Sequence, residues 1–555
     1  MSKLQKIRTE LLAVRELSRA GALPSPKLLP QIVKLRRAGG EAAGPAIYGT
    51  MYGDRVAIID PHGPLTYAEL ARTCNGLING LREVLPAGEQ PTVGVMCRNS
   101  RYVVIGLLSA TGLGARVVLL NTDLGAKQMA EVVERERVDV ILHDAEFTPV
   151  LELIDTGVRR YVAWADEPGD VGTGDAQTID ELVARSSTAL PPAPASSSSL
   201  VILTSGSTGA PKGAPREGAL AMSLPAGFVS KIAVRGSDRV LMSAPAFHGW
   251  GLLATMVCLL TGATVVMDRR FKAPNSLELL IEHRCTAAMM VPTMLRRLMD
   301  QGADELSRVD RSMLRMIASG GAKLDESLVL SVQKQFGHVL HNLYGATEAS
   351  YITIATPEDL AVRPTTAGRA PLGVEVAIIS GGVRVPTGES GQIYVRSGSQ
   401  ISKYTNGASK ETLDGMLNTG DTGRIDSAGR LFVEGRSDGM IISGGENVFP
   451  EEVELALGRH RDIVDAAVVA VADADFGQRL RAFVVPRDGA TITEADVKTY
   501  VGTELSRSRV PRDVFLVPEL PRGAQGKVTK LTLDALVAAR STPDTPERVA
   551  GQVEQ

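Results

Sequence analysis

Apolar and polar residues follow two different rhythms between residues 45 and 185. Short apolar runs at 92–96, 117–121 and 138–142 have the length of buried strands, whereas apolar positions in 67–85 recur at the spacing of a helix. Strands that alternate with helices in this way are typical of open α/β sheets. The pattern therefore predicts an α/β fold for this part of the chain.

One uncharged stretch, residues 250–267, is long enough to span a membrane. Gly262 divides it, and glycine is favoured where a helix ends. The part before Gly262 (251–261) suits a helix, and the β-branched part after it (263–267) suits a strand. We therefore interpret the stretch as a buried helix followed by a core strand rather than as one membrane-spanning helix.

The first 38 residues differ from the rest of the chain in charge. They contain nine Lys or Arg and two Glu, a net charge of +7. Apolar residues recur among them at helical spacing, at Leu4, Ile7, Leu11 and Val14. Such a helix can lie on an anionic membrane or pack against the body of the protein, and the sequence leaves both interpretations open. The segment has no apolar core followed by a small-residue cleavage site, so a secretory signal is not expected, whereas a transit peptide stays open.

Length and composition limit the class of protein. A chain of 555 residues predicts two or more domains, and its net charge of −3 gives no reason to expect nucleic acid as a partner. The Pro- and Ser-rich segment 186–199 predicts a mobile linker, and the polar segment 541–555 predicts a frayed tail. Four cysteines without paired spacing favour a reducing, cytoplasmic compartment over a disulfide framework or a zinc ribbon: Cys74, Cys97, Cys258 and Cys285.

The strongest chemical signal is the sequence TSGSTGAPKG at 204–213, directly after the apolar run 200–203. Gly206 and Gly209 allow backbone conformations in which successive N–H groups point into one anion-binding concavity. Hydroxyl groups and one positive charge are added by Thr204, Ser205, Ser207, Thr208 and Lys212. The commonest phosphate loop ends Gly-Lys-Ser/Thr at a helix start, but here Gly213 follows the lysine, so a different phosphate loop is indicated.

This order resembles the signature loop of the adenylate-forming superfamily, which includes acyl-CoA synthetases, luciferases and the adenylation domains of peptide synthetases. In that superfamily the loop grips the β- and γ-phosphates of ATP. The resemblance therefore implies ATP-binding roles for Thr204, Ser205, Gly206, Ser207, Thr208, Gly209 and Lys212. Ser207 stands where many members have threonine, a mild change because both side chains offer one hydroxyl.

Residues 344–348 (YGATE) follow an apolar stretch and match a second motif of the superfamily. The carboxyl ends of strands are where α/β sheets place ligands. The resemblance implies that Tyr344 stacks on adenine, with Gly345 in the same nucleotide site. It also implies that Thr347 bonds a phosphate and that Glu348 holds Mg²⁺, which binds through one or two carboxylates and retained waters.

Further along the chain, the resemblance assigns Asp421 and Arg436 to the ribose of the nucleotide. A carboxylate such as Asp421 can accept hydrogen bonds from both ribose hydroxyls. The resemblance also places a hinge between two domains at Asp438. Gly439 stands where many relatives carry a second acid, a departure that bears on the kinetics of the hinge.

Residues 439–456 (GMIISGGENVFPEEVELA) resemble a GGENVxPxEVE run found in acyl-CoA synthetases, with a helix predicted from Pro450. The resemblance places the glycine loop near the tunnel for the CoA thiol, which favours CoA as acceptor and involves Ser443, Gly444, Gly445 and Glu446. Residues 521–527 match a C-terminal PxxxxGK motif. That match makes Lys527 the expected catalytic lysine of the adenylation step.

The acid to be activated is indicated less directly. Adenylation domains of peptide synthetases hold the substrate amino group with an aspartate in an FDxS motif, whereas this chain has His248 in the matching stretch, so an amino acid is disfavoured. His248 belongs either to the carboxylate-binding wall, as the resemblance implies, or to the packed core. The resemblance puts Ser319, Gly320 and Gly321 in the acyl pocket. A medium- or long-chain fatty acid is the first expectation and an aryl acid the second, and a luciferase-like oxygenase would share every motif.

The resemblance implies a large N-terminal domain of α/β subdomains with a β-barrel-like part, and a small mobile α+β C-terminal domain. The expected boundaries are a basic extension over 1–44, the large domain over 45–436, the small domain over 437–535 and a tail over 536–555. The expected reaction uses ATP, CoA and Mg²⁺, and rotation of the small domain exchanges Lys527 for the glycine loop between two half-reactions. A homodimer and peripheral membrane contact through residues 1–38 stay open.

Overall fold

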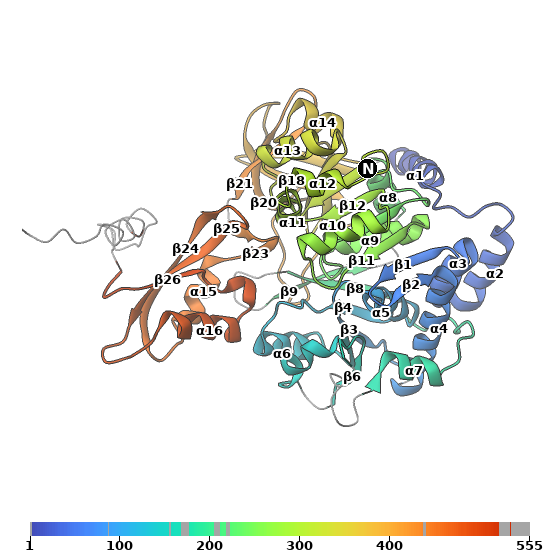
Figure 1. Ribbon diagram of the computed structural model, residues 1–555, viewed down its shortest axis with the longest axis horizontal. Helices are drawn as coiled ribbons and strands as arrows, with labels where there is room; N and C mark the ends of the chain where they lie inside the picture. Colours follow the sequence, from blue (N-terminus) through green and yellow to red (C-terminus); the bar gives the residue numbers. More distant parts are fainter. Residues whose placement is uncertain are drawn as a thin grey trace, which may run out of the picture.

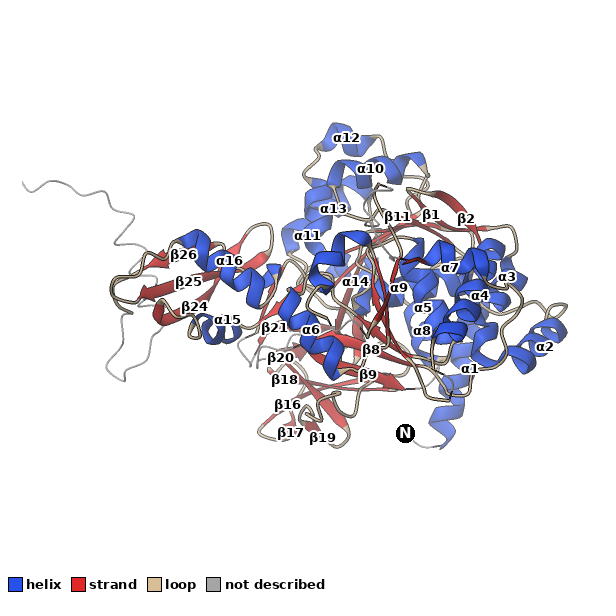
Figure 2. Ribbon diagram, turned by 90° about the horizontal axis from the view of Figure 1, so that it is seen from below, coloured by secondary structure: helices blue, strands red, loops and turns tan. Residues whose placement is uncertain are grey.

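The computed structural model has a large N-terminal domain and a small C-terminal domain set to one side of it (Figure 1, Figure 2). The structure describes residues 3–86, 88–154, 157–167, 177–204, 211–217, 222–436, 440–520 and 533. Several predicted site residues lie outside the described residues: Ser205, Gly206, Ser207, Thr208, Gly209, Asp438 and Lys527. The predicted tail over 541–555 also lies outside them.

The predicted α/β alternation builds a seven-stranded sheet in the order β7-β6-β5-β3-β4-β8-β9, parallel except for β9. Its strands are β3 (Thr92–Met96), β4 (Arg116–Leu119), β5 (Val140–His143), β6 (Arg159–Val162), β7 (Gln177–Thr178), β8 (Ser199–Thr204) and β9 (Lys212–Glu217). Its helices are α4 (Tyr67–Val84), α5 (Arg101–Gly112), α6 (Ala126–Arg135) and α7 (Ile179–Arg185). The predicted strand 92–96 is confirmed to the residue, and the predicted helix 67–85 to within one residue.

The uncharged stretch forms part of a second sheet, in the order β15-β14-β13-β12-β10-β11-β1-β2. As predicted, it forms a helix, α9 (Gly249–Thr261), that ends at Gly262 with φ 78°, and then a strand, β11 (Thr264–Met267). The other strands are β1 (Val56–Asp60), β2 (Gly63–Thr66), β10 (Arg239–Met242), β12 (Ala287–Met290), β13 (Met316–Gly320), β14 (Leu340–Ala346) and β15 (Ser350–Ala355). The other helices are α8 (Ser223–Val229), α10 (Ala273–Glu282), α11 (Pro292–Met299), α12 (Ala303–Ser307), α13 (Glu326–Phe336) and α14 (Pro357–Val362). In the described part of the chain, no helix is both long and apolar enough to cross a membrane.

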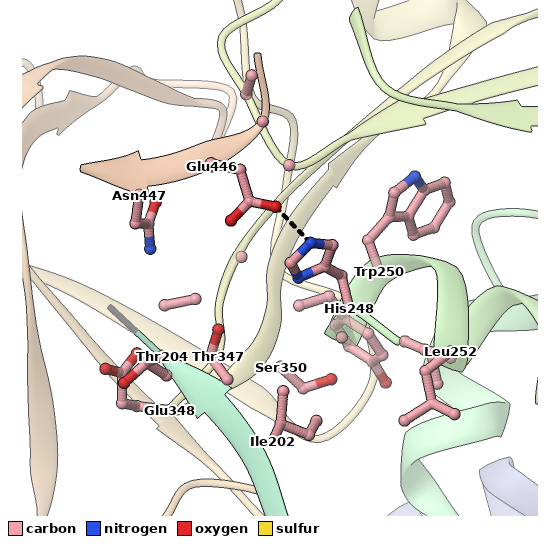
Figure 3. A pocket seen from close by; sticks show the side chains of 18 of the residues that line it. Ile202, Thr204, His248, Trp250, Leu252, Thr347, Glu348, Ser350, Glu446 and Asn447 are labelled. Atoms are coloured by element: carbon pink, nitrogen blue, oxygen red, sulfur yellow. Dashed lines mark hydrogen bonds and ion pairs between the residues drawn. The ribbon is translucent and has the colours of Figure 1, made fainter. Parts of the chain in front are cut away.

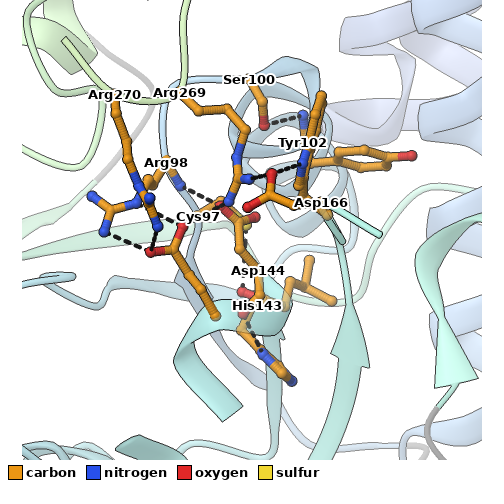
Figure 4. A network of polar contacts seen from close by, with 12 residues as sticks. Cys97, Arg98, Ser100, Tyr102, His143, Asp144, Asp166, Arg269 and Arg270 are labelled. Carbon is orange, nitrogen blue, oxygen red and sulfur yellow. Dashed lines mark hydrogen bonds and ion pairs between the residues drawn. The ribbon is translucent and has the colours of Figure 1, made fainter. Parts of the chain in front are cut away.

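A network of charged side chains joins the two α/β sheets where their strands end (Figure 4). Arg269, which follows β11, donates to Asp144 at 3.2 Å and to Glu146 at 2.7 Å, both beyond the end of β5. Arg98 also donates to Glu146 at 2.7 Å. Burial raises the pKa of Asp144 to about 6, although Arg98 and Arg269 oppose the rise. These contacts fix one sheet against the other.

The β-barrel-like part corresponds to an antiparallel sheet in the order β17-β16-β18-β20-β19, with β21 also paired to β20. Its strands are β16 (Val374–Ser380), β17 (Val383–Arg384), β18 (Gly391–Ser397), β19 (Thr412–Leu413), β20 (Met416–Ile425) and β21 (Leu431–Arg436). Asp421 on β20 lies directly opposite Arg436 on β21. The sheet thus brings together two residues that are separate in the sequence motifs.

The small domain has the α+β architecture that the resemblance implies. Its strands are β22 (Ile441–Ser443), β23 (Glu446–Val448), β24 (Ile463–Asp473), β25 (Gly477–Pro486) and β26 (Asp513–Leu516). Two helices, α15 (Pro450–Leu457) and α16 (Glu494–Glu504), pack on them, and α15 begins at the predicted Pro450. The N–H of Gly125 in the large domain donates to the Leu505 carbonyl at 2.8 Å, so the two domains share backbone contacts.

The N-terminal segment forms α1 (Lys3–Arg19), α2 (Leu29–Gly39), a short 3-10 helix (Gly40–Ala42) and α3 (Ala43–Tyr52). α1 packs on α8 and buries Ala13 and Leu17, while Leu11 and Val14 of the predicted apolar stripe stay 68% and 47% exposed. The predicted boundary at residue 44 is wrong as a structural division, because it falls inside α3.

The Pro- and Ser-rich segment 186–199 is not the free linker that its composition predicted. Asn79 on α4 donates to the carbonyls of Ser187 and Ala189 at 2.6 and 3.1 Å. Arg82 on the same helix donates to the Pro192 carbonyl at 2.7 Å. Side chains of α4 therefore bind the segment through its backbone, which its composition could not reveal.

Candidate active site

A cavity of about 1270 Å³ lies between the large and the small domain and is lined by residues of both (Figure 3). Three of its walls are the ends of strands or the turns after them: Thr204 ends β8, Tyr344 lies near the end of β14, and His248 follows β10. The carboxyl ends of strands are the usual ligand-binding edge of an α/β sheet. Described residues from three of the predicted motif regions thus line one cavity.

Tyr344, Asp421 and Arg436 form a hydrogen-bonded group in the wall. The Tyr344 hydroxyl donates to Asp421, and Arg436 Nη1 donates to the other carboxylate oxygen of Asp421 at 2.9 Å. Burial and the neighbouring carboxylate raise the pKa of Tyr344 well above its usual value, so the phenol stays protonated. Asp421 also lines the cavity, where a carboxylate can accept hydrogen bonds from a ligand.

Lys212 and Thr204 lie opposite each other in the β8–β9 pair. The ammonium of Lys212 lies 5.7 Å from the ring centroid of Tyr404. Both Thr204 and Lys212 line the cavity. The residues at the two described ends of the predicted phosphate loop thus line the same cavity.

Glu348 is buried beside two residues that the motifs did not indicate. It accepts a hydrogen bond from the hydroxyl of Tyr404. Arg216 on β9 donates to the Thr347 carbonyl at 2.6 Å, and burial lowers its pKa to about 10, with Glu348 opposing the shift. Arg216 and Tyr404 lie 131 and 56 residues from their partners, so no local sequence signal could have found them.

Mg²⁺ was expected at Glu348, and the residues present fit a nucleotide-borne ion. The described residues contain no group of three or more His, Cys, Asp or Glu that could hold a metal by themselves. Mg²⁺ bound with ATP needs one or two carboxylates, since phosphate oxygens and waters complete its shell. Glu348, a cavity-lining carboxylate, meets that requirement.

His248 and Glu446 join the two domains across the cavity, with Nε2 and Oε1 2.6 Å apart (Figure 3). His248 precedes α9 in the large domain, and Glu446 begins β23 in the small one. Burial alone would lower the pKa of His248, but the Glu446 carboxylate outweighs it and the net pKa is raised. Burial would likewise raise the pKa of Glu446, but His248 and Arg509 hold it below its usual value. The pair therefore favours an imidazolium–carboxylate contact.

Of the predicted glycine loop, Gly445 and Glu446 line the cavity, whereas Ser443 and Gly444 do not. Gly444 has φ 61°, and a Cβ there would lie 2.7 Å from the Phe476 ring. Phe476 itself lines the cavity. Gly444 thus shapes the loop against Phe476 while Gly445 and Glu446 face the site.

The predicted acyl pocket needs correction. Gly321 lines the cavity, but Ser319 and Gly320 do not, because they lie within β13 and are covered by its neighbours. A Cβ on Gly320 would come within 3.1 Å of the Leu343 carbonyl oxygen, so this glycine permits close strand packing rather than room for a ligand. Part of the apolar lining comes from α5 and α9 instead: Leu107, Leu108, Leu252, Leu253 and Met256.

Comparison with known proteins agrees with this geometry. The family model described as AMP-binding enzyme matches residues 48–405, and that of its C-terminal domain matches residues 452–527. An indoleacetate–CoA ligase of Aromatoleum aromaticum is 32% identical over 88% of this chain and 96% of its own. A long-chain-fatty-acid–CoA ligase of Mycobacterium tuberculosis is 29% identical over 84% of this chain and 92% of its own.

Solved structures give the same result. An amide bond synthetase of Marinactinospora thermotolerans has a TM-score of 0.78 at 28% identity, covering 89% of this chain and 99% of its own. An o-succinylbenzoate CoA synthetase of Bacillus subtilis has a TM-score of 0.75 at 25% identity, covering 88% and 98%. With both family models matched in order, the chain belongs to the AMP-binding enzymes of the adenylate-forming superfamily, on its acyl-CoA synthetase branch.

Proposed function

We propose that the protein activates a carboxylic acid with ATP to an acyl-adenylate and then transfers the acyl group to CoA. One observation carries the proposal. A single cavity unites Asp421 and Arg436, the phosphate-loop ends Thr204 and Lys212, and the glycine-loop residue Glu446 of the small domain. A nucleotide, an acid and a thiol acceptor can therefore meet there.

In the first half-reaction, a carboxylate oxygen attacks the α-phosphate of ATP, forming a P–O bond while the bond to pyrophosphate breaks. Lys212 and the phosphate loop would offset the charge of the phosphates, and Asp421 with Arg436 would hold the ribose. Glu348 would hold Mg²⁺, which supplies charge neutralisation at the phosphates. Lys527 is proposed as the lysine that acts on this step.

In the second half-reaction, the CoA sulfur attacks the acyl carbonyl, the C–S bond forms and AMP leaves. The presence of Gly445 and Glu446 in the cavity supports assignment of this domain orientation to the thioester step. The His248–Glu446 contact would fasten the small domain in that orientation. Gating by domain motion would then let one cavity run both reactions.

For the acid, we propose a medium- or long-chain fatty acid. The support is the apolar lining from Leu107, Leu108, Leu252, Leu253 and Met256. A ring-bearing acid, the aryl alternative, is the second candidate, and it is favoured by the likeness to the indoleacetate–CoA ligase.

A screen for AMP release tests the proposal, with acids of graded length and aromaticity, each with and without ATP and CoA. We expect AMP release and CoA thioester formation for at least one class of apolar acid. AMP release without thioester would contradict the CoA step. Replacing CoA by an amine then tests amide formation, and light emission without CoA tests a luciferase-like oxygenase.

We also propose a cytoplasmic protein that contacts anionic membranes through α1. Leu11 and Val14 are exposed on a helix that lies in the basic N-terminal segment. Exposed apolar groups beside positive charges are what an interfacial helix requires. A homodimer remains compatible with this arrangement.

A further inference from the structure

The cavity continues from His248 along one face of α9. Five residues of that helix line it, Trp250 and four others at the spacing of a single face, Gly249, Leu252, Leu253 and Met256. Met256 lies eight positions beyond His248, about 12 Å along a helix. The cavity therefore has a long axis that leads away from the His248 end.

Strand β8 gives a second measure of the same axis. Thr204 ends the strand at the phosphate loop and Ser199 begins it, and both line the cavity. Their five-residue separation corresponds to about 16 Å in a strand. Strand β8 and helix α9 thus line one channel, which has a nucleotide end and a distal end.

The N-terminal segment forms the distal end. Arg36, Glu41, Gly44 and Tyr48 line the cavity there. The hydroxyl of Tyr52 on α3 donates to the Leu260 carbonyl at 2.6 Å, so α3 abuts the end of α9 that lies away from His248. Arg36, Glu41 and Gly44 precede the region that the AMP-binding family model matches, residues 48–405.

This distal wall is packed into the fold. The Ser198 N–H, beside the start of β8, donates to Glu41 at 2.8 Å. A Cβ on Gly39 would meet Leu190 at 3.2 Å, and one on Gly112 of α5 would meet Ala42 at 3.2 Å. The segment is therefore held between α5 and residues 186–199 rather than lying loosely over them.

The chemistry of the lining changes along the channel. Its middle is apolar, but the distal wall carries a guanidinium, a carboxylate and two hydroxyls, on Arg36, Glu41, Tyr48 and Thr111. No hydrogen bond joins the Tyr48 hydroxyl to another described residue, and Tyr48 lines the cavity. A site with unused hydrogen-bonding groups discriminates against a ligand that cannot bond them.

We propose that residues 36–48 form the distal wall of the acid channel and select acids with an apolar body and a hydrogen-bonding group, such as a hydroxyl or ketone, at the far end. The proposal rests on the proposed function and names the substrate class of that same site. The Tyr48 hydroxyl would donate to a distal hydroxyl or ketone, and the Glu41 carboxylate would accept from a distal hydroxyl.

A filling substitution tests the wall. A Cβ on Gly44 would meet no atom within 4 Å, so Gly44→Leu should extend into the channel without disturbing the fold. We expect kcat/KM for decanoate to fall about tenfold relative to that for hexanoate. Gly398→Leu, at a glycine outside the cavity, is the matched control and should leave the ratio unchanged.

A second variant tests the polar selection. Wild-type enzyme should prefer ω-hydroxydecanoate to decanoate in kcat/KM, and Tyr48→Phe should reduce that preference about fivefold, the value of one uncharged hydrogen bond. Tyr500→Phe in the small domain is the control, because Tyr500 does not line the cavity. If thioester forms but Gly44→Leu and Tyr48→Phe both leave their kcat/KM ratios unchanged, this inference is wrong and the proposed function stands. The absence of thioester from every acid would overturn the proposed function and this inference with it.

Discussion

At the scale of single residues, the His248–Glu446 contact has the widest consequence, because it joins the two domains inside the cavity. Burial disfavours the charged form of each side chain, and attraction between the imidazolium and the carboxylate offsets this desolvation penalty. Arg509, buried beside Glu452 and within reach of the Asn447 carbonyl, adds positive charge on the small-domain side. The contact should therefore depend on pH.

We expect the imidazole of His248 to titrate above its ordinary pKa of 6.5 in the wild-type protein. Because the pKa of His248 is higher in the folded than in the unfolded protein, the contact contributes its full stabilisation below pH 6.5. This stabilisation is lost as the pH rises through the raised pKa. In Glu446→Gln the carboxylate is gone while burial remains, so the pKa of His248 should fall. NMR titration of ¹³C-labelled histidine measures it, with His248→Gln to assign the signal. Glu451→Gln, an exposed acid on α15, should leave the titration unchanged, and an unchanged value in Glu446→Gln would contradict the pairing.

Asp421 should matter for nucleotide affinity. Asp421→Asn removes the charge that Tyr344 and Arg436 orient, and it weakens acceptance of hydrogen bonds from a ribose. We expect the Kd for AMP to rise about tenfold to a hundredfold, as for the loss of a charged hydrogen bond. Calorimetric titration measures the Kd. Asp426→Asn, whose carboxylate binds Arg430 in a turn outside the cavity, is the control, and equal affinities in both variants would contradict the assignment.

The sequence indicated most of the nucleotide end, because motifs such as 344–348 keep their residues adjacent in the chain and therefore adjacent in space. It did not indicate Arg216, whose partner carbonyl lies 131 residues away, or the His248–Glu446 contact, which spans 198 residues. Gly320 shows the reverse error. A glycine can serve strand packing rather than a ligand, and the sequence cannot distinguish the two.

At the scale of elements, local periodicity sufficed for helices and strands whose apolar face is continuous, including α4, α9 and β3. It left the orientation of α1 open. That helix carries two apolar stripes, and the structure buries the one with Ala13 and Leu17, which packs on α8. Small residues allow close approach between helices, but a partner helix far along the chain decides which stripe is used.

The exposed stripe of α1 leads to a prediction on membrane binding. Leu11→Gln with Val14→Gln removes exposed apolar area without touching the packed face of the helix, so the fold should be retained. We expect the double variant to lose most co-sedimentation with vesicles rich in anionic lipid. Vesicles of zwitterionic lipid serve as the control for charge. Equal sedimentation of wild type and variant would remove the membrane proposal.

At the scale of the whole molecule, the small domain is oriented with its glycine loop lining the cavity. Contacts outside the cavity support this orientation. The Ser508 N–H donates to Asp123 at 3.0 Å, and Gly125 bonds Leu505. Burial and the nearby Glu446 carboxylate raise the pKa of Asp123, so this orientation brings an acid of each domain close together.

We therefore expect one substitution to abolish only the first half-reaction and another to abolish only the second. Lys527→Ala should abolish formation of acyl-adenylate while thioester formation from synthetic acyl-adenylate and CoA survives. Gly445→Leu should do the reverse, because Gly445 has φ 95° and lines the cavity in this orientation, so a side chain there strains the loop and narrows the thiol path. Pyrophosphate release measures the first step and thioester from the synthetic adenylate the second. A variant that lost both steps equally would show that its residue serves the fold or both reactions. The model in which Lys527 and the glycine loop enter the cavity in turn would then be wrong for this protein.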